Sequence, residues 1–423
     1  MPYLETITFV KEGESMETRD GARAAELKRI YAPSVALSIV VAALVSFACN
    51  LDKFIYPPII PLVVKDIHIS FARAGFLMGI VGIVGIFVAI PGGIMISRIG
   101  IRSSGVLGLL ITALGSLIIV TATNYWFMVA GRGIAGSAER LVQIVGLTII
   151  GVFIPRERNA FAQGVLSAMI PISVATSGST MGFFGTVYGW RSVFGVSIIT
   201  QVVIAILFYL LFLHAEKPEQ KAPQPGFGQV PSSKPESIWS NAEVWKLTII
   251  WGCFQGGSFI IATWFPTFLK ETLRVNVGVA ALMASIGWWV AIISSIAIGW
   301  LSDLSGKRKI WIVGSSIAVA ICGFILPLSS TAAPILVLIA LAGLFASMLP
   351  PTLMAMVPEV VKDKRQIPQA FGILSAGLSL ALSIMPTLAG WLRDISGAFT
   401  STLYLMACLS IVCAVVGLTL KAR

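Results

Sequence analysis

Residues 93–102 read GIMISRIGIR, and residues 299–308 read GWLSDLSGKR. Each segment follows a long apolar run, has glycine at its first and eighth positions, and ends in basic residues. Two further pairs recur at nearly the same spacing: Pro61…Lys65-Asp66 with Pro266…Lys270-Glu271, and GVLSA at 164–168 with GILSA at 372–376. Three matches at equivalent positions indicate that the chain is built from two related halves.

The composition around these segments is that of an integral membrane protein. Of the 423 residues, 57% are hydrophobic and only 12% are charged, whereas a soluble protein carries about 25% charged residues. Since a membrane helix needs about 20 apolar residues, roughly a dozen spans leave no room for a soluble catalytic domain. The two His and the scattered Cys favour neither a metal cluster nor a catalytic triad. We therefore expect neither an enzyme, nor a cofactor, nor a bound metal.

The apolar runs predict an all-α fold of twelve transmembrane helices. They form two pseudo-symmetric six-helix halves around a central cavity. We expect a tail at 1–30, a first half at 31–213, a linker at 214–241 and a second half at 242–423. The spans are 33–62, 72–97, 103–123, 124–151, 159–187, 191–213, 242–269, 276–303, 309–330, 332–358, 368–393 and 398–420. Because each half has an even number of spans, the two repeats run parallel.

The charge distribution predicts the topology. The net charge of +11 would suit a nucleic-acid partner, but most Lys and Arg lie in segments on one side of the spans. By the positive-inside rule, both termini and the linker are cytoplasmic. The first 30 residues lack the pattern of a signal peptide. We therefore expect a multi-pass protein of the inner or plasma membrane, a monomer surrounded by lipid, with no nucleic-acid partner.

The two glycine-containing segments resemble the signature loop of the major facilitator superfamily. The first copy has Ser97 where that family usually has Asp, and the second has Leu304 in place of a basic residue. The resemblance implies a gating role, in which an acidic side chain facing a helix N-terminus stabilises one closed state. A plain tight turn with topology-setting charges is the alternative. The gating candidates are Gly93, Ser97, Arg98, Gly100, Arg102, Gly299, Asp303, Gly306 and Arg308.

Three ionisable residues lie inside the fourth predicted span. Arg132 and Glu139 are seven residues apart and so share one helix face, while Arg140 points about 100° away. An Arg near the middle of a membrane helix costs about 2.5–3.5 kcal/mol to insert, so these groups should face protein. Glycines around Arg132 let a neighbouring helix or a ligand approach. For Arg140 we expect a contact within its own half, or a position near the cytoplasmic surface.

A second pair of charges, Asp52 and Lys53, lies in the first span at a depth similar to that of Arg132. Together the four residues resemble the organic anion:cation symporters, a branch that includes sugar-acid and sialic-acid transporters. The resemblance implies that Asp52 and Glu139 carry protons and that Arg132 binds a substrate carboxylate. Lys53 replaces the Arg usual in that branch and so loses the bidentate fork. The alternative is a static buried salt-bridge network, although buried ion pairs contribute little net stability.

Weaker polar candidates for the cavity are distributed over several spans. Arg393 and Asp394, at the outer end of the eleventh span, are predicted to form a local ion pair. Polar residues of this kind in membrane helices more often form hydrogen bonds between helices than contacts with a ligand. The candidates for substrate contact, besides Arg132 and Lys53, are Asn50, Gln143, Gln255, Ser375 and Ser379.

These features predict a secondary active transporter that works by alternating access. The leading hypothesis is symport of a small organic anion with protons. The alternatives are an anion exchanger, a drug/proton antiporter, and a membrane receptor or scaffold that transports nothing. Pro171 follows Ile170 rather than Gly, so the Gly-Pro motif frequent in drug exporters is absent.

Overall fold

The structure is a computed structural model that describes residues 33–154, 156–215, 238–305, 308–361 and 367–421. Every regular element in these ranges is helical, and twelve helices or helix pairs are long and apolar enough to cross a membrane. The predicted all-α, twelve-span fold is therefore confirmed. The expected N-terminal tail and most of the linker lie outside the described residues.

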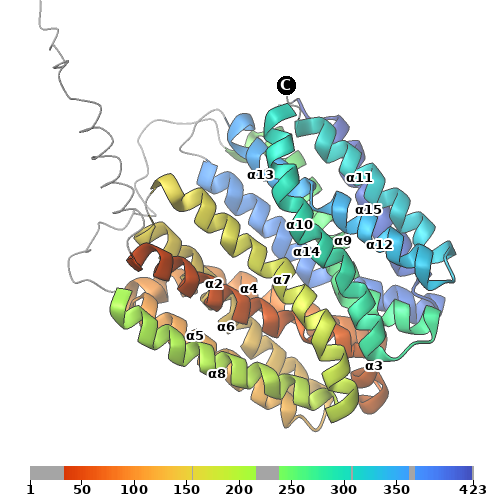
Figure 1. The fold of residues 1–423 in the computed structure, drawn as a ribbon, viewed down its shortest axis with the longest axis horizontal. Coiled ribbons are helices and arrows are strands. Elements are labelled where there is room, and N and C mark those ends of the chain that lie inside the picture. Colours follow the sequence, from red (N-terminus) through yellow and green to blue (C-terminus); the bar gives the residue numbers. More distant parts are fainter. Residues whose placement is uncertain (1–32, 155, 216–237, 306–307, 362–366, 422–423) are drawn as a thin grey trace, which may run out of the picture.

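The helices follow the predicted spans closely (Figure 1). The first six spans correspond to α2 (Pro33–Phe54), α3 (Tyr56–Ile67), α4 (Phe71–Ile99), α5 (Ile101–Val120), α6 (Tyr125–Phe153), α7 (Arg156–Tyr188) and α8 (Trp190–Ala215). The remainder are η1 (Ile238–Ser240), α9 (Ala242–Leu273), α10 (Val277–Ser305), α11 (Arg308–Ile325), η2 (Leu326–Leu328), α12 (Ala332–Ala346), α13 (Leu349–Val360), α14 (Ile367–Ser396) and α15 (Thr400–Leu418).

Two spans are broken by proline pairs. The first span divides into α2 and α3 at Ile55, just before Pro57 and Pro58 in the first turn of α3. The tenth divides into α12 and α13, and Pro350-Pro351 opens α13. Proline has no N–H to donate to the preceding turn, so each pair leaves carbonyl oxygens of that turn free. In both spans the break therefore coincides with the proline pair.

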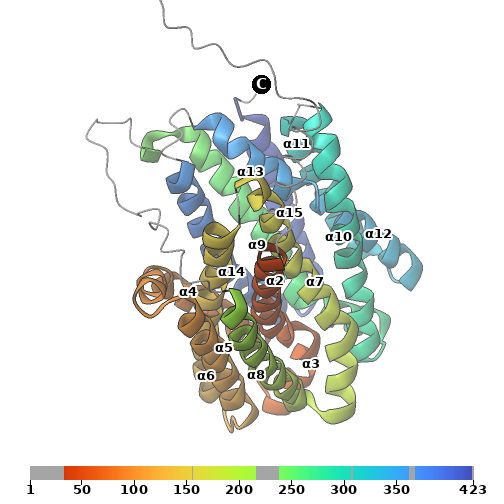
Figure 2. The same cartoon turned by 60° about the vertical axis from the view of Figure 1, so that its left-hand side comes forward.

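The helices gather into two groups that face each other (Figures 1 and 2). In Figure 1, α2 and α4 to α8 occupy the lower left, α3 lies at the lower right, and α9 to α15 occupy the upper right. In the first group, α5 packs on α6 and α8, and α2 packs on α6, α7 and α8. In the second, α9 packs on α14 and α15, and α11 packs on α15. The principal contacts between the groups join α4 to α14 and α7 to α10.

The contacts between the groups concentrate at one end of the bundle. We call the end where α8 finishes and α9 begins the linker side, and the opposite end the far side. On the far side, a Cβ added at Gly182 of α7 would come within 2.7 Å of the Ala281 Cβ, and one at Gly178 within 2.9 Å of the Ser285 Cβ. Such separations leave no space for a side chain, so the far side is closed.

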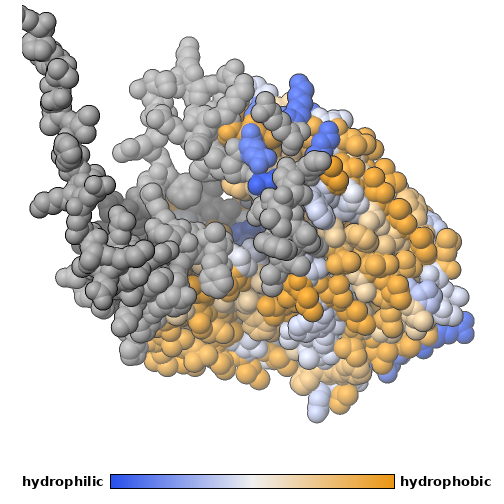
Figure 3. Space-filling model, turned by 45° about the horizontal axis from the view of Figure 1, so that its top comes forward, coloured by the Kyte–Doolittle hydropathy of each residue, from blue (hydrophilic) through white to orange (hydrophobic). Residues whose placement is uncertain are grey.

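The linker side differs. A Cβ added at Gly93 in α4, Gly164 in α7 or Gly372 in α14 would meet nothing within 4 Å. Figure 3 looks toward this end, and the described helices that it shows carry a largely apolar outer surface, as contact with lipid requires. Among the described residues, the two groups are in close contact on the far side and leave space beside these three glycines on the linker side. We call this conformation closed on the far side and open on the linker side.

An acidic side chain joins the two groups on the far side. The carboxylate of Asp394 in α14 accepts hydrogen bonds from the backbone N–H of Phe71 (3.0 Å) and Ala72 (2.8 Å), at the N-terminus of α4. Its sequence neighbour Arg393 contacts Glu271 at 3.3 Å instead. The predicted local pair of Arg393 and Asp394 is therefore wrong, because the exposed N–H groups of α4 offer Asp394 a helix terminus.

This contact predicts the effect of a substitution. Asp394→Ala removes both acceptors, and a carboxylate at a helix N-terminus contributes about 0.5–2 kcal/mol. We expect the far side to open about 2- to 30-fold more often. The measurement is the rate at which a maleimide labels a cysteine introduced at Ala284, a far-side pocket position, in a background without the native cysteines.

The control for this experiment is Asp394→Asn, which keeps one acceptor oxygen but loses the charge. We expect its labelling rate to lie between those of the parent and Asp394→Ala. If Asp394→Ala labels at the parent rate while remaining folded, the contact does not stabilise the closed far side.

Candidate functional site

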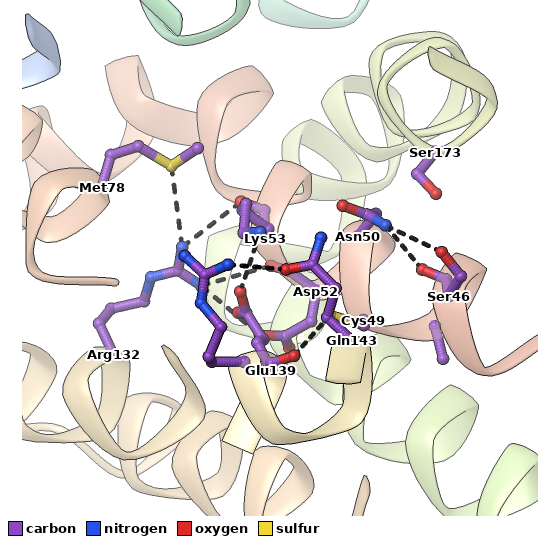
Figure 4. A network of polar contacts seen from close by, with 12 residues as sticks. Ser46, Cys49, Asn50, Asp52, Lys53, Met78, Arg132, Glu139, Gln143 and Ser173 are labelled. Carbon is purple, nitrogen blue, oxygen red and sulfur yellow. Dashed lines mark hydrogen bonds and ion pairs between the residues drawn. The ribbon is translucent and has the colours of Figure 1, made fainter. Parts of the chain in front are cut away.

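Arg132 lies in α6 and is enclosed by its own group of helices, with 1% of its side chain exposed. Its Nε donates to the carbonyl oxygen of Leu77 in α4 at 3.2 Å. Its Nη1 and Nη2 donate to the carbonyl oxygens of Asp52 and Lys53, at 3.3 and 3.4 Å. The guanidinium carbon also lies 5.7 Å from the centre of the Tyr56 ring. Each of the three guanidinium nitrogens of Arg132 therefore donates to a carbonyl oxygen of the protein in this conformation (Figure 4).

The helix break between α2 and α3 supplies some of these acceptors. In an unbroken helix, the carbonyl of Lys53 would accept from residue 57 and that of Phe54 from residue 58. Both positions are proline, so neither carbonyl has a partner in its own helix. Lys53 O instead accepts from Arg132, and Phe54 O accepts from Ser177 Oγ of α7 at 2.5 Å.

Asp52 is fully buried and paired with Arg132. Its Oδ2 lies 3.6 Å from Arg132 Nη1. Its Oδ1 accepts hydrogen bonds from Ser116 of α5, at 2.7 Å, and from Ser197 of α8. The predicted network between the first and fourth spans is therefore present. The two serines were not predicted, because a serine within an apolar span gives no sign of its partner.

Glu139 and Lys53 form the second pair of this network. Lys53 Nζ lies 3.6 Å from Glu139 Oε2, and the exposed fractions of the two side chains are 13% and 2%. Neither carboxylate oxygen of Glu139 has a hydrogen-bond partner among the described residues. A buried carboxylate with one loosely placed cation and no hydrogen-bond donor is weakly stabilised in its charged form. We call Asp52, Lys53, Arg132 and Glu139 the charge network.

The glycines around Arg132 bring helices together. A Cβ at Gly131 would lie 2.8 Å from the carbonyl oxygen of Gly115 in α5, and one at Gly136 would lie 2.8 Å from the Cα of Val81 in α4. Of the two interpretations of these glycines, close approach by a neighbouring helix describes the structure, because α4 and α5 occupy the space a ligand would need.

Arg140 forms a contact that the sequence did not predict. Its Nη1 donates to Gln143 Oε1 at 3.0 Å, and its Nη2 donates to Ser379 Oγ at 3.2 Å. Ser379 belongs to α14, in the other group of helices. The expectation that Arg140 contacts its own half or reaches the cytoplasmic surface is therefore incomplete, because one of its two hydrogen bonds crosses between the halves.

The other predicted cavity residues are dispersed. Asn50 is buried and donates to Ser46 O, one turn earlier in its own helix, at 2.8 Å. Ser375 is exposed on α14 and donates within its own helix to Phe371 O at 2.8 Å. Gln255 is half-buried on α9. The structure therefore brings Gln143 and Ser379 together at Arg140, but it does not bring Asn50, Ser375 or Gln255 to the charge network through a hydrogen bond.

Those predicted gating residues that the structure describes lie on the linker side. Gly100 has a φ of 84° between α4 and α5, a conformation suited to glycine. Arg102 lies 3.7 Å from the centre of the Tyr209 ring, and Arg308 forms an ion pair with Glu359 at 3.1 Å. Arg98 ends α4 and Gly299 lies within α10. The side chains of Ser97 and Asp303, and all of Gly306, lie outside what the structure describes.

Comparisons with known proteins place this chain in a family. The model of the Major Facilitator Superfamily matches residues 42–332 and 260–423. The chain is 21% identical over 366 residues to the hexuronate transporter of Bacillus subtilis, covering 83% of this chain and 86% of the relative. It is 21% identical over 364 residues to the probable L-galactonate transporter of Escherichia coli, covering 82% and 80%.

A solved structure gives the same fold. It is that of a bacterial homolog of the human lysosomal transporter Spinster, in an inward-facing and unoccupied conformation. The TM-score is 0.73 at 14% identity, over 91% of this chain and 96% of that chain. The family match spans most of the chain, and the relatives confirm the resemblance to transporters of organic acids. The chain belongs to the Major Facilitator Superfamily and is a membrane transporter, not an enzyme.

Proposed function

We propose that the protein couples the transport of a small organic anion, a carboxylate, to the movement of protons in the same direction. The observation that carries this proposal is the charge network, in which the Glu139 carboxylate has Lys53, at 3.6 Å, as its ion-pair partner and its two oxygens accept no hydrogen bond among the described residues. The named substrates of the two relatives, a hexuronate and L-galactonate, are carboxylates and support this substrate class.

In this mechanism Glu139 and Asp52 take up and release protons. Protonation of Glu139 removes one buried negative charge. The substrate anion then compensates the positive charge of Lys53, which would otherwise stay unpaired. A buried charge without a partner costs several kcal/mol, so the carrier reorients when both ligands are bound or both are absent. Arg132 remains a candidate for anion binding, which would require its release from the acceptors that enclose it here.

The moving parts are the two halves, 31–213 and 242–423, connected by the linker. The basic residues of the linker side, such as Arg98 and Arg308, favour a cytoplasmic location for that side and both termini, in the inner or plasma membrane. The conformation described here is then open to the cytoplasm. The loops at Gly93–Arg102 and Gly299–Arg308 act as gates that close this side, and the protein works as a monomer.

The test is uptake of labelled D-glucuronate or L-galactonate into liposomes that contain the purified protein. We expect accumulation when only an inward proton gradient is imposed, and its collapse when a protonophore is added. Accumulation that ignores the pH difference but needs an anion inside would identify an exchanger. Proton-driven efflux of cationic drugs would identify an antiporter, and no flux of any kind would favour a receptor or scaffold.

A further inference from the structure

Three cations lie near the middle of the first group of helices, and two of them have carboxylate partners. Arg132 is paired with Asp52, and Lys53 with Glu139, each at 3.6 Å. Arg140 is half-buried and forms no ion pair within 4.0 Å with any described carboxylate. Its neighbours are the neutral side chains of Gln143 and Ser379. Arg140 is therefore a membrane-embedded cation that has no ion-pair partner of its own among the described residues, and the nearby Glu139 is already paired with Lys53.

Such a cation is costly within a membrane. Two neutral acceptors satisfy some of its N–H groups but leave its charge unbalanced, whereas a carboxylate supplies both charge and acceptor oxygens. Arg132 differs, because it forms an ion pair with Asp52 and each of its guanidinium nitrogens donates to a carbonyl oxygen of the protein. A carboxylate bound between the halves can replace the neutral partners of Arg140, Gln143 and Ser379, with stronger, charged acceptors.

Arg140 lies where the closed far side meets the opening on the linker side. Along α14, Ser383 packs against Gly82 of α4, so that a Cβ at Gly82 would lie 2.7 Å from Ser383 Oγ. One turn toward the linker side, Ser379 bonds Arg140, and a further turn on, Ser375 is exposed.

The chain also leaves room for this guanidinium. A Cβ added at Gly85 of α4 would lie 3.1 Å from Arg140 Nε and 3.3 Å from its Nη2. The glycine therefore lets the Arg140 side chain lie against α4 and extend toward α14, at the end of the opening.

We propose that Arg140 binds the carboxylate of the transported anion, and that Gln143 and Ser379 form hydrogen bonds with the hydroxyl groups of that anion. The proposal rests on the proposed function and names the residue that recognises the substrate. Because Arg140 belongs to α6 and Ser379 to α14, an anion held between them contacts both halves. Binding is thereby linked to the movement that opens and closes the two sides.

The test is the affinity of purified protein for D-glucuronate and L-galactonate, with D-glucuronamide as a neutral analogue, measured by calorimetry. Arg140→Gln should weaken carboxylate binding about 10- to 100-fold, because a charge-assisted hydrogen bond is lost, and should leave glucuronamide binding unchanged. Arg140→Lys should recover part of the carboxylate affinity, since it keeps the charge without the planar fork.

Two further variants extend the test, the first at a partner of the anion and the second as a control. Ser379→Ala removes one neutral hydrogen-bond partner and should weaken carboxylate binding about 2- to 10-fold, less than Arg140→Gln does. Arg191→Gln removes an arginine that is paired with Asp66 on the far side, and should change nothing.

The preference for acid over amide decides the outcome, because a purely structural role of Arg140 would not alter it. If folded Arg140→Gln keeps the parent preference, the proposal is overturned while the proposed function stands. If Arg140→Gln does not fold, Arg140→Lys decides: an unchanged preference for the acid overturns the proposal. If neither acid binds the parent protein, the proposed function and this proposal fail together.

Discussion

Glu139→Gln should abolish proton-driven accumulation of substrate and leave exchange of substrate between the two sides of the membrane at least partly intact. Glutamine has the shape of the protonated acid but can neither take up nor release a proton. The Glu139 carboxylate lies 3.6 Å from Lys53 Nζ, and its oxygens accept no hydrogen bond among the described residues. The substitution therefore breaks no hydrogen bond to the side chain of residue 139. The carrier then behaves as one that is permanently protonated at this position.

Two liposome assays separate these effects. In the first, a pH difference is the sole driving force, and we expect accumulation to fall to the level of protein-free liposomes. In the second, liposomes preloaded with unlabelled substrate take up labelled substrate without any gradient, and we expect a rate within about tenfold of the parent. Glu243→Gln is the matched control, because Glu243 pairs with Lys246 at the linker end of α9. Concentrative uptake by Glu139→Gln would show that another group couples the proton.

The second acid of the charge network should behave differently. Asp52 is held by Ser116, Ser197 and Arg132, so Asp52→Asn changes a site in which several partners were arranged around a charged carboxylate. We expect Asp52→Asn to lose accumulation as well, and to lose more of the exchange than Glu139→Gln does. Equal exchange rates in the two variants would indicate that Asp52 has no positioning role.

The sequence predicted what depends on position along a helix. The seven-residue spacing of Arg132 and Glu139, together with the depth of Asp52, placed the charge network correctly, because helical rise and periodicity fix both quantities. A proline pair in the sequence also indicates where two of the acceptors lie. Pro57 and Pro58 free the carbonyls of Lys53 and Phe54, which become acceptors for Arg132 and Ser177.

What could not be predicted depends on how the two halves meet. The contact of Arg140 with Ser379, and that of Asp394 with the N-terminus of α4, join residues that are far apart in the chain. Their alignment follows from the register of α4 and α6 against α14, and the periodicity of a single helix carries no information on it. It also changes with the conformation of the carrier, so one sequence encodes more than one set of such contacts.

Arg132→Ala should have the largest effect on stability among the substitutions considered. It leaves Asp52 buried without its cation and removes the donor from the carbonyl of Leu77. Breaking a buried ion pair by removing one partner costs about 3–5 kcal/mol. By contrast, Arg191→Ala breaks an exposed pair with Asp66 and should cost no more than about 1 kcal/mol. Unfolding of the purified variants in sodium dodecyl sulfate measures the loss of stability in Arg132→Ala and in Arg191→Ala.

The double variant Asp52→Asn/Arg132→Gln distinguishes a static salt bridge from a functional one. It removes both charges while keeping side chains of similar size that form hydrogen bonds. We expect it to regain most of the stability lost in Arg132→Ala, because no buried charge is left unpaired. If the pair only holds α2 to α6, uptake driven by a proton gradient returns together with stability. If the pair handles protons or substrate, the double variant is stable and inactive. We expect this second result, because both charged side chains are buried and a buried ion pair contributes little net stability.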